Sequence, residues 1–169
     1  MRRSSKIALA LALGLLVALG FLYVRSLDTD APPLTPRVAS QLLERGERAF
    51  ERRSVEGIME LVAPKARLFG RNPDQLRLML ARAFQEMGPN RITAERRDLI
   101  VEPTGDTGTA SFDVRIGERG GRADVLYYDL HVSLDLVKVR VPHWLGLYTT
   151  EEWKVSRAES IGGLDLPDL

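Results

Sequence analysis

Apolar and polar residues alternate with a period of two over the long stretch Ala123–Pro142. The even positions are the apolar ones: Leu126, Tyr128, Leu130, Val132, Leu134 and Leu136. This pattern predicts a strand with one buried face and one solvated face, as in antiparallel sheets. After Leu136 the apolar residues shift to odd positions, so we expect a β-bulge near Leu136 and Val137. Because such a bulge bends a strand, we also expect a strongly curved sheet.

Ahead of this strand, apolar residues recur at helical spacing in three segments. The first predicted helix covers residues 36–52, with Thr35 as its N-cap and Pro at its first position. The second begins at the N-cap Ser54 and ends at Pro64. The third begins at the N-cap Asn72 and ends at residues 88–89, which are Gly and Pro. The outer side of the first helix has charges of both signs, which is typical of a solvated helix face.

Alternating runs separated by turn residues predict the strands of the sheet. Four of them follow the third helix, at residues 92–103, 107–118, 123–142 and 148–159. A further short strand is expected at residues 65–70, between the second and third helices. The predicted class is therefore α+β, with three N-terminal helices packed on a curved antiparallel sheet of four strands.

The N-terminal residues 7–24 contain no charged side chain, and Arg2, Arg3 and Lys6 precede them. A run of this length is about enough to cross a bilayer, so we expect one N-terminal transmembrane helix. The basic residues before it place the N-terminus in the cytoplasm. A cleaved signal peptide is the alternative, although the run is longer than usual and no small-x-small cleavage site follows it.

These patterns divide the chain into four parts. They are an anchor or signal peptide at 1–27, a linker at 28–35, a domain at 36–160 and a flexible tail at 161–169. The anchor predicts a single-pass protein of the inner (cytoplasmic) membrane, with its C-terminal domain outside the cytoplasm. Residues 7–24 would make the contact with the membrane.

Composition excludes several kinds of chemistry. The chain has no cysteine, so thiol catalysis, thiolate metal sites and disulfides are ruled out. It has two histidines without metal-ligand spacing, and we expect no metal and no cofactor. Four of the 24 basic residues precede residue 28, which leaves 20 against 23 acidic residues and a net charge of about −3. That balance argues against nucleic acid as a partner.

Three helices, a short strand and a four-stranded meander closing with Trp153 and Val155 resemble the NTF2-like (SnoaL-like, cystatin-like α+β cone) superfamily. The resemblance covers about residues 36–160. It implies a cone-shaped space between helices and sheet, where enzymes of the superfamily place an Asp, often with a His or Tyr. It implies no single activity, because the superfamily includes isomerases, dehydratases, ligand binders, transport adaptors and scaffold domains. An anchor before this fold is similar to the layout of the inner-membrane scaffold subunits of type IV secretion systems.

Asp129 and His131 are the most suggestive acid–base pair, but both occupy odd positions on the predicted solvated face. We therefore predict no catalytic residue. Candidate residues for lining a ligand pocket are Phe112, Tyr128, Leu130 and Trp153. Two functions stay open. One is a membrane-anchored extracytoplasmic, non-enzymatic module for ligand binding or protein assembly, and the alternative is a small-molecule isomerase or hydratase with an apolar cone pocket.

The loop before the last strand contains an apolar cluster where polar turn residues are usual. Its candidate interaction residues are His143, Trp144 and Leu145. The cluster either folds back as a lid on the core or contacts a protein partner or the membrane surface. A homodimer through the solvated sheet face is a further hypothesis, which rests on Tyr127, His131 and Ser133.

Overall fold

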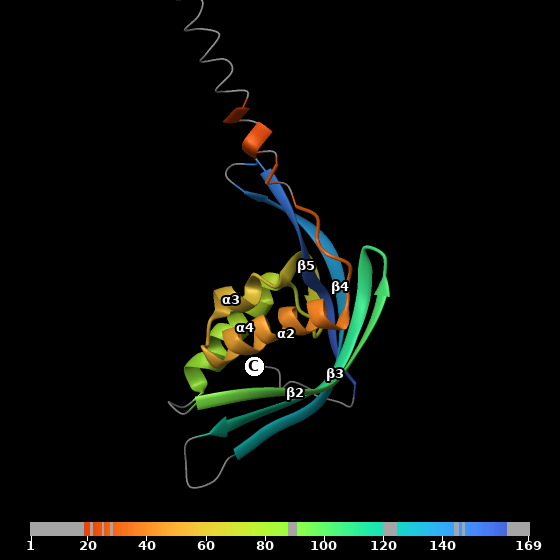
Figure 1. Ribbon diagram of the computed structural model, residues 1–169. Coiled ribbons are helices and arrows are strands. Elements are labelled where there is room, and N and C mark those ends of the chain that lie inside the picture. Colours follow the sequence, from red (N-terminus) through yellow and green to blue (C-terminus); the bar gives the residue numbers. More distant parts are fainter. Residues whose placement is uncertain are drawn as a thin grey trace, which may run out of the picture. The chain divides into compact units, whose positions relative to one another are not determined.

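The computed structural model describes residues 19–20, 22–24, 26–27, 29–87, 91–119, 125–143, 146 and 148–161 (Figure 1). Side chains are described for these residues except 91–92, 118–119, 125–128 and 161. The chain divides into two compact units. Unit 1 comprises residues 1–31 and 140–152, and unit 2 comprises residues 32–139 and 153–169.

Three labelled helices lie in the described part of unit 2. They are α2 (Pro36–Glu51), α3 (Val55–Met59) and α4 (Pro73–Glu86). Each begins at a predicted N-cap whose side chain accepts a hydrogen bond from a backbone N–H in the first turn. In α4 the cap is a capping box, in which Asn72 and Gln75 each accept from the other's backbone N–H. The three predicted helices are present, but α3 ends before the predicted boundary at Pro64.

The described strands form one sheet in the order β1-β5-β4-β3-β2. They are β1 (Val62–Leu68), β2 (Arg91–Thr104), β3 (Thr107–Arg119), β4 (Val125–His143) and β5 (Tyr148–Ile161). The α+β class is confirmed, whereas a four-stranded, purely antiparallel sheet was wrong. The short strand before α4 starts earlier than predicted and joins the sheet, because its backbone pairs in parallel with β5. This pairing also ends α3 early, since Val62 lies opposite Val155 in the ladder.

The alternation in β4 places its apolar side chains as predicted. Val132, Leu134 and Leu136 are between 1% and 7% exposed, while the odd positions between them are only partly buried. We call the face that bears Leu134 the inner face, and α2, α3 and α4 lie on this side of the sheet (Figure 1). The helices pack together through aromatic side chains, since the Phe50 and Phe84 rings meet edge to face at 5.4 Å.

The sheet is bent by bulges, but not at the predicted position. The β3–β4 register runs without a shift through Leu136 and Val137, so a bulge there was wrong for this ladder. The shift lies at Tyr127, between the pairs Ile116–Tyr128 and Gly117–Leu126. A second bulge in β2 leaves Asp98 and Leu99 outside the register, with Asp98 at a φ of 53°.

The polar residue that follows Leu136 on the inner face is Lys138, and its surroundings explain the change in pattern. Its Nζ lies 5.5 Å from the ring centroid of Trp153 and 3.1 Å from Asp106 Oδ1. The lysine stem can therefore cover the aromatic ring while its ammonium group reaches a carboxylate. The even positions of β4 therefore stay on the inner face beyond Leu136, because the long amphipathic side chain of Lys138 takes the place of an apolar one.

The residues just before α2 are packed against the sheet within unit 2. Leu34 is 4% exposed, and its Cδ2 would lie 2.3 Å from a Cβ added to Gly108 of β3. The Trp153 Nε1 donates a hydrogen bond of 2.8 Å to the carbonyl oxygen of Pro32. A glycine in β3 therefore gives Leu34 the room to reach the sheet.

Unit 1 contains a short contact between the chain before Ala31 and β5. Thr29 bridges in parallel to Thr150, and its carbonyl oxygen accepts from the Glu151 N–H at 2.8 Å. Most of residues 7–24, where the anchor was predicted, lies outside the described residues. No helix within the described ranges is long and apolar enough to cross a membrane.

Two glycine substitutions should shift stability in opposite directions. We expect Gly108→Ala to lower the free energy of unfolding by about 1–3 kcal/mol, because the added Cβ collides with Leu34 and the backbone. Gly46→Ala should raise the free energy of unfolding by about 0.5–1 kcal/mol, because alanine is more favourable than glycine inside a helix such as α2. The added Cβ has room there, since it would lie 3.4 Å from Leu61, an ordinary contact distance. Urea unfolding in neutral detergent measures both. Equal stability of Gly108→Ala and wild type would contradict the packing of Leu34.

Candidate functional site

The main charged cluster on the inner face is centred on Arg96 of β2. Arg96 pairs in register with Val114 of β3, so its side chain shares the inner face with Val114. Its Nε lies 3.2 Å from Glu47 Oε1 of α2, and its Nη2 donates to Ser40 Oγ at 3.0 Å. The Arg96 and Glu47 side chains are only 13% and 25% exposed. The cluster therefore links the first helix to the sheet through a largely buried ion pair.

An acidic stripe on α2 faces this part of the sheet. Ser40, Glu44, Glu47 and Glu51 follow one another at spacings of three or four residues, so they lie along one side of the helix. The Ser40 hydroxyl donates to Glu44 Oε1 at 3.2 Å while it accepts from Arg96. Ser40, Glu44 and Glu47 are therefore connected to one another through hydrogen bonds and the Arg96 guanidinium.

The pKa of Glu47 is raised above its ordinary value. The main cause is burial, which disfavours the charged carboxylate, and the nearby carboxylates of Glu44 and Glu51 act in the same direction. The positive charge of Arg96 acts against them and lowers the pKa. Glu47 is therefore a carboxyl group that holds its proton more tightly than one in water.

One nitrogen of the Arg96 guanidinium has no partner. Among the described side chains, Arg96 Nη1 and Arg71 Nε are the buried nitrogens without a hydrogen bond. An unpaired buried donor costs about 1–3 kcal/mol, and more when the group is charged. A carbonyl or carboxylate oxygen brought to Nη1 would remove that cost. Arg96 can therefore act as a donor to an acidic or carbonyl-bearing ligand.

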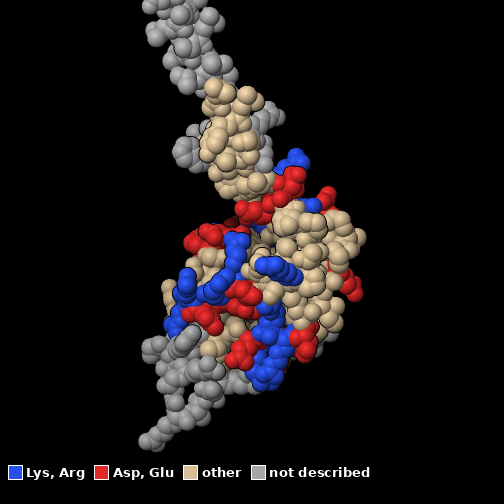
Figure 2. Space-filling view, in the orientation of Figure 1, with Lys and Arg blue, Asp and Glu red and all other residues tan. Residues whose placement is uncertain are grey.

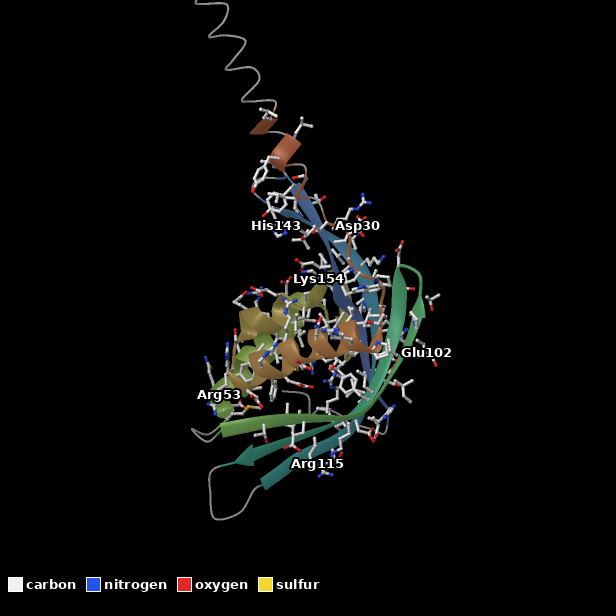
Figure 3. The ribbon with its side chains drawn as sticks, in the orientation of Figure 1. Asp30, Arg53, Glu102, Arg115, His143 and Lys154 are labelled. Carbon is white, nitrogen blue, oxygen red and sulfur yellow. The ribbon has the colours of Figure 1, made fainter. Side chains whose placement is uncertain are left out.

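The suggestive pair Asp129 and His131 lies on the opposite, outer face of the sheet. His131 Nδ1 is 2.6 Å from Asp113 Oδ1, and Arg115 Nη2 donates to Asp129 Oδ2 at 2.9 Å. Both are directly opposed cross-strand pairs of β3 and β4, and their side chains are 40–50% exposed. Figure 3 shows Arg115 pointing away from the helices. Each of the two residues is paired with a different partner rather than with the other.

The predicted pocket residues have different surroundings. Phe112 and Trp153 are 7% and 5% exposed, and Leu130 is partly buried. The Trp153 indole is held by Pro32 and lies beside the Lys138 ammonium group. The side chain of Tyr128 lies outside the described residues, although its backbone is part of β4.

His143, which was predicted in the loop, is the last residue of β4, and its ring stacks on that of Tyr148 at the start of β5 with ring centroids 5.0 Å apart. Its Nε2 lies 2.8 Å from the Thr150 hydroxyl oxygen. Trp144 and Leu145 lie outside the described residues, so the lid and contact hypotheses stay predictions. Over the described ranges, His, Asp and Glu form no group of three that could hold a metal ion.

Comparison with known proteins identifies the fold. No family model matches the sequence. No curated protein sequence matches it either. Among solved structures, Aln2 from a Streptomyces species has a TM-score of 0.63 at 13% identity, over 77% of this chain and 94% of that chain. An NTF2-like protein of unknown function from Pseudomonas putida has a TM-score of 0.58 at 15% identity, over 80% and 92%.

A protein from Catenulispora acidiphila in complex with S-DNPA has a TM-score of 0.56 at 14% identity, over 73% of this chain and 90% of that chain. Because the sequence identities are this low, the comparisons establish the fold but not the function. The fold is NTF2-like. The Arg96–Glu47 pair of this NTF2-like chain lies between its helices and the inner face of its sheet.

Neither Arg96 nor Glu47 was among the residues singled out from the sequence. Glu47 had been assigned to a solvated helix face, because charges of both signs occur along residues 36–52. The usable signal was in β2, where Arg96 follows Ile92 and Ala94 at alternate positions. A charged residue in such an apolar series indicates a buried partner on another element.

Glu47 should make stability depend on pH. Because its pKa is higher in the folded than in the unfolded chain, the folded state binds more protons above the ordinary value of 4.5. The free energy of unfolding should therefore fall as the pH rises through the folded pKa, and Glu47→Gln should remove this part of the slope. Urea unfolding at a series of pH values measures the effect. Glu86→Gln, an exposed change in α4, is the control, and a Glu47→Gln slope equal to wild type would contradict the assignment.

Proposed function

We propose that this chain is a membrane-anchored, non-enzymatic NTF2-like module that binds a small ligand on the extracytoplasmic side of the cytoplasmic membrane. The observation that carries the binding role is the buried, unpartnered Nη1 of Arg96 beside the inner face. An oxygen acceptor of a ligand at that position would complete the hydrogen bonding of the guanidinium. The ligand would therefore bear a carbonyl or carboxylate group on an apolar frame.

The surroundings of Arg96 fit an apolar frame. The inner face nearby is built from side chains such as Phe112 and Val132, which are 7% and 6% exposed. An apolar lining with a few placed polar groups is the common composition of small-molecule sites. The protein from Catenulispora acidiphila was solved with a small molecule, S-DNPA, so a chain of this fold can accommodate one.

The placement of acids and bases supports a non-enzymatic role. Asp113, Asp129 and His131 face outward, and each takes part in a cross-strand ion pair. A general acid or base must come within hydrogen-bond reach of its substrate. For a substrate on the inner face, these three groups lie on the wrong side of the sheet.

The alternative is a small-molecule isomerase or hydratase that uses the same region. It is favoured by Glu47, whose burial raises its pKa. A carboxyl group whose pKa is moved toward neutral pH is suited to proton transfer. The two functions differ in what happens to the bound molecule: the module releases it unchanged, and the enzyme converts it.

The anchor and the location rest on the sequence. The uncharged run 7–24 follows three basic residues and lacks a cleavage site, which supports retention in the inner membrane with the C-terminal domain outside the cytoplasm. The membrane is then one partner, and a second copy or another protein is a further one. Tyr127, His131 and Ser133 remain the proposed contact for a homodimer.

Arg96→Met should release the ligand. The full chain, purified from its native membrane in neutral detergent, is expected to carry a small molecule that appears in mass spectra of the denatured sample. Arg96→Met should lose it, because the donor Nη1 is gone, whereas Arg97→Gln should keep it, because Arg97 lies opposite Asp113 on the outer face. Equal retention in both variants would contradict the role of Arg96. Conversion of the released molecule by wild type, abolished in Glu47→Gln, would identify the enzyme instead.

A single introduced cysteine tests the orientation, because the natural chain has none. Glu102→Cys in exposed β2 should react with a membrane-impermeant maleimide in intact cells whose outer layers are permeable. Ser4→Cys, ahead of the predicted anchor, should react only after lysis. The reverse labelling pattern, or recovery of a shortened soluble chain, would rule out this topology.

A further inference from the structure

A second polar site lies on α2 beside the Arg96 cluster, about 100° further around the helix. An open groove of about 230 Å³ between α2 and α3 is lined by Arg45, Arg48, Ala49, Arg52, Ser54, Gly57 and Glu60, and its charged side chains are exposed. We call it the arginine pocket. The three arginines follow one another at i, i+3 and i+7, so their side chains lie along one side of the helix.

The helix separates its charges into two stripes. Each of the acidic residues Glu44, Glu47 and Glu51 comes one position before an arginine of the pocket. One position is a rotation of about 100° around a helix, so the carboxylates lie on a different side. The acidic stripe meets the sheet through Glu47, while the basic stripe meets the pocket. Figure 2 shows basic and acidic side chains close together over the helices of unit 2.

Within the described residues the pocket arginines form no direct ion pair, although the charge of Arg48 acts on the nearby Glu47 and lowers its pKa. Across the described residues, the side chains of Arg45, Arg48 and Arg52 form no ion pair or hydrogen bond, whereas five other arginines each pair with a carboxylate. With Glu60 as its one acidic lining residue, the pocket has a formal charge of +2. Lys154 Nζ, which donates to the Glu60 carbonyl oxygen at 2.8 Å, brings a further cation to that residue. Like charges gathered around a groove repel one another and favour a bound anion.

The pocket wall is formed by a close approach of α2 and α3. The chain turns between them at Arg53, which has a φ of 55° and follows the end of α2. A Cβ on Gly57 would lie 3.1 Å from Ala49 Cβ and 3.0 Å from Ser54 Oγ, so glycine permits this approach. Ser54 Oγ accepts from the Gly57 N–H at 3.0 Å, which leaves its hydroxyl proton free to donate to a ligand.

We propose that the arginine pocket binds the phosphate group of a phosphomonoester or phospholipid headgroup. A guanidinium fork matches two phosphate oxygens, and three forks with a hydroxyl donor suit a group with several acceptor oxygens. The Glu60 carboxylate would accept from a hydroxyl of the organic part, and this favours a phosphate that carries a polyol. The site is separate from Arg96 and goes beyond the ligand proposed there.

Calorimetric titration of the full chain in neutral detergent, without phosphate or sulfate, tests the pocket. Glycerol 3-phosphate is the soluble probe. We expect binding that weakens with added salt and falls by about tenfold in Arg48→Gln, because one charge-assisted bidentate contact is lost. Arg45→Gln should weaken binding in the same direction. Arg37→Gln removes an exposed arginine of the same helix outside the pocket and should leave binding within about twofold.

Mixed micelles separate the two sources of phosphate. If micelles that contain phosphatidylglycerol displace the probe and micelles of phosphatidylcholine alone do not, the natural occupant is a lipid headgroup. If neither kind of micelle displaces the probe, the occupant is a soluble phosphate ester. Loss of the bound ligand in Arg96→Met and loss of probe binding in Arg48→Gln are separate readouts, so failure of the proposal for Arg96 and failure of the proposal for the arginine pocket remain distinguishable. Thermal melting of each variant confirms folding. The proposal is overturned if wild type does not bind the probe, or if Arg37→Gln weakens binding as much as Arg48→Gln.

Discussion

The largely buried ion pair between Arg96 and Glu47 sets the rotation of α2 against the sheet. A pair of this kind contributes little net stability, but removal of one partner leaves a largely buried charge uncompensated. Arg96 has one further partner in Ser40, which lies on the same side of α2. The helix is therefore held at two points about two turns apart. Any other rotation would separate Glu47 from the guanidinium.

This rotation decides where the remaining charges of α2 lie. Glu47 contacts β2, the arginines line the groove beside α3, and the apolar residues Ala39, Leu42 and Ala49 are buried on the remaining side of the helix. One helix thus provides a polar group to the inner face of the sheet and a set of arginines to a separate pocket. The two proposed sites are physically linked, because they share the element whose orientation the ion pair determines.

Much of the fold could be predicted from local patterns. The caps Thr35, Ser54 and Asn72 marked the helix starts, and the alternation in β4 identified Val132 and Leu134 as buried. Such features depend on neighbours within a few residues. The partnership of β1 with β5, the Tyr127 bulge and the contact of Glu47 with Arg96 depend on residues far apart in the chain, so no local period indicates them. The acidic and basic residues of α2 also lie along adjacent sides of the helix, which their mixed order in the sequence did not indicate.

The parallel pairing of β1 with β5 also has a consequence for biosynthesis. Val62 lies opposite Val155, and Leu68 lies opposite Ala158, so the partner of β1 is made about 90 residues later. Until then β1 has an unpaired edge, and its backbone N–H and C=O groups are open to other strands. Contacts of such long separation form slowly because a large loop must close first. The pairing of β1 can therefore form only after β5 has left the ribosome, and until then β1 lacks the partner that it has in the folded protein.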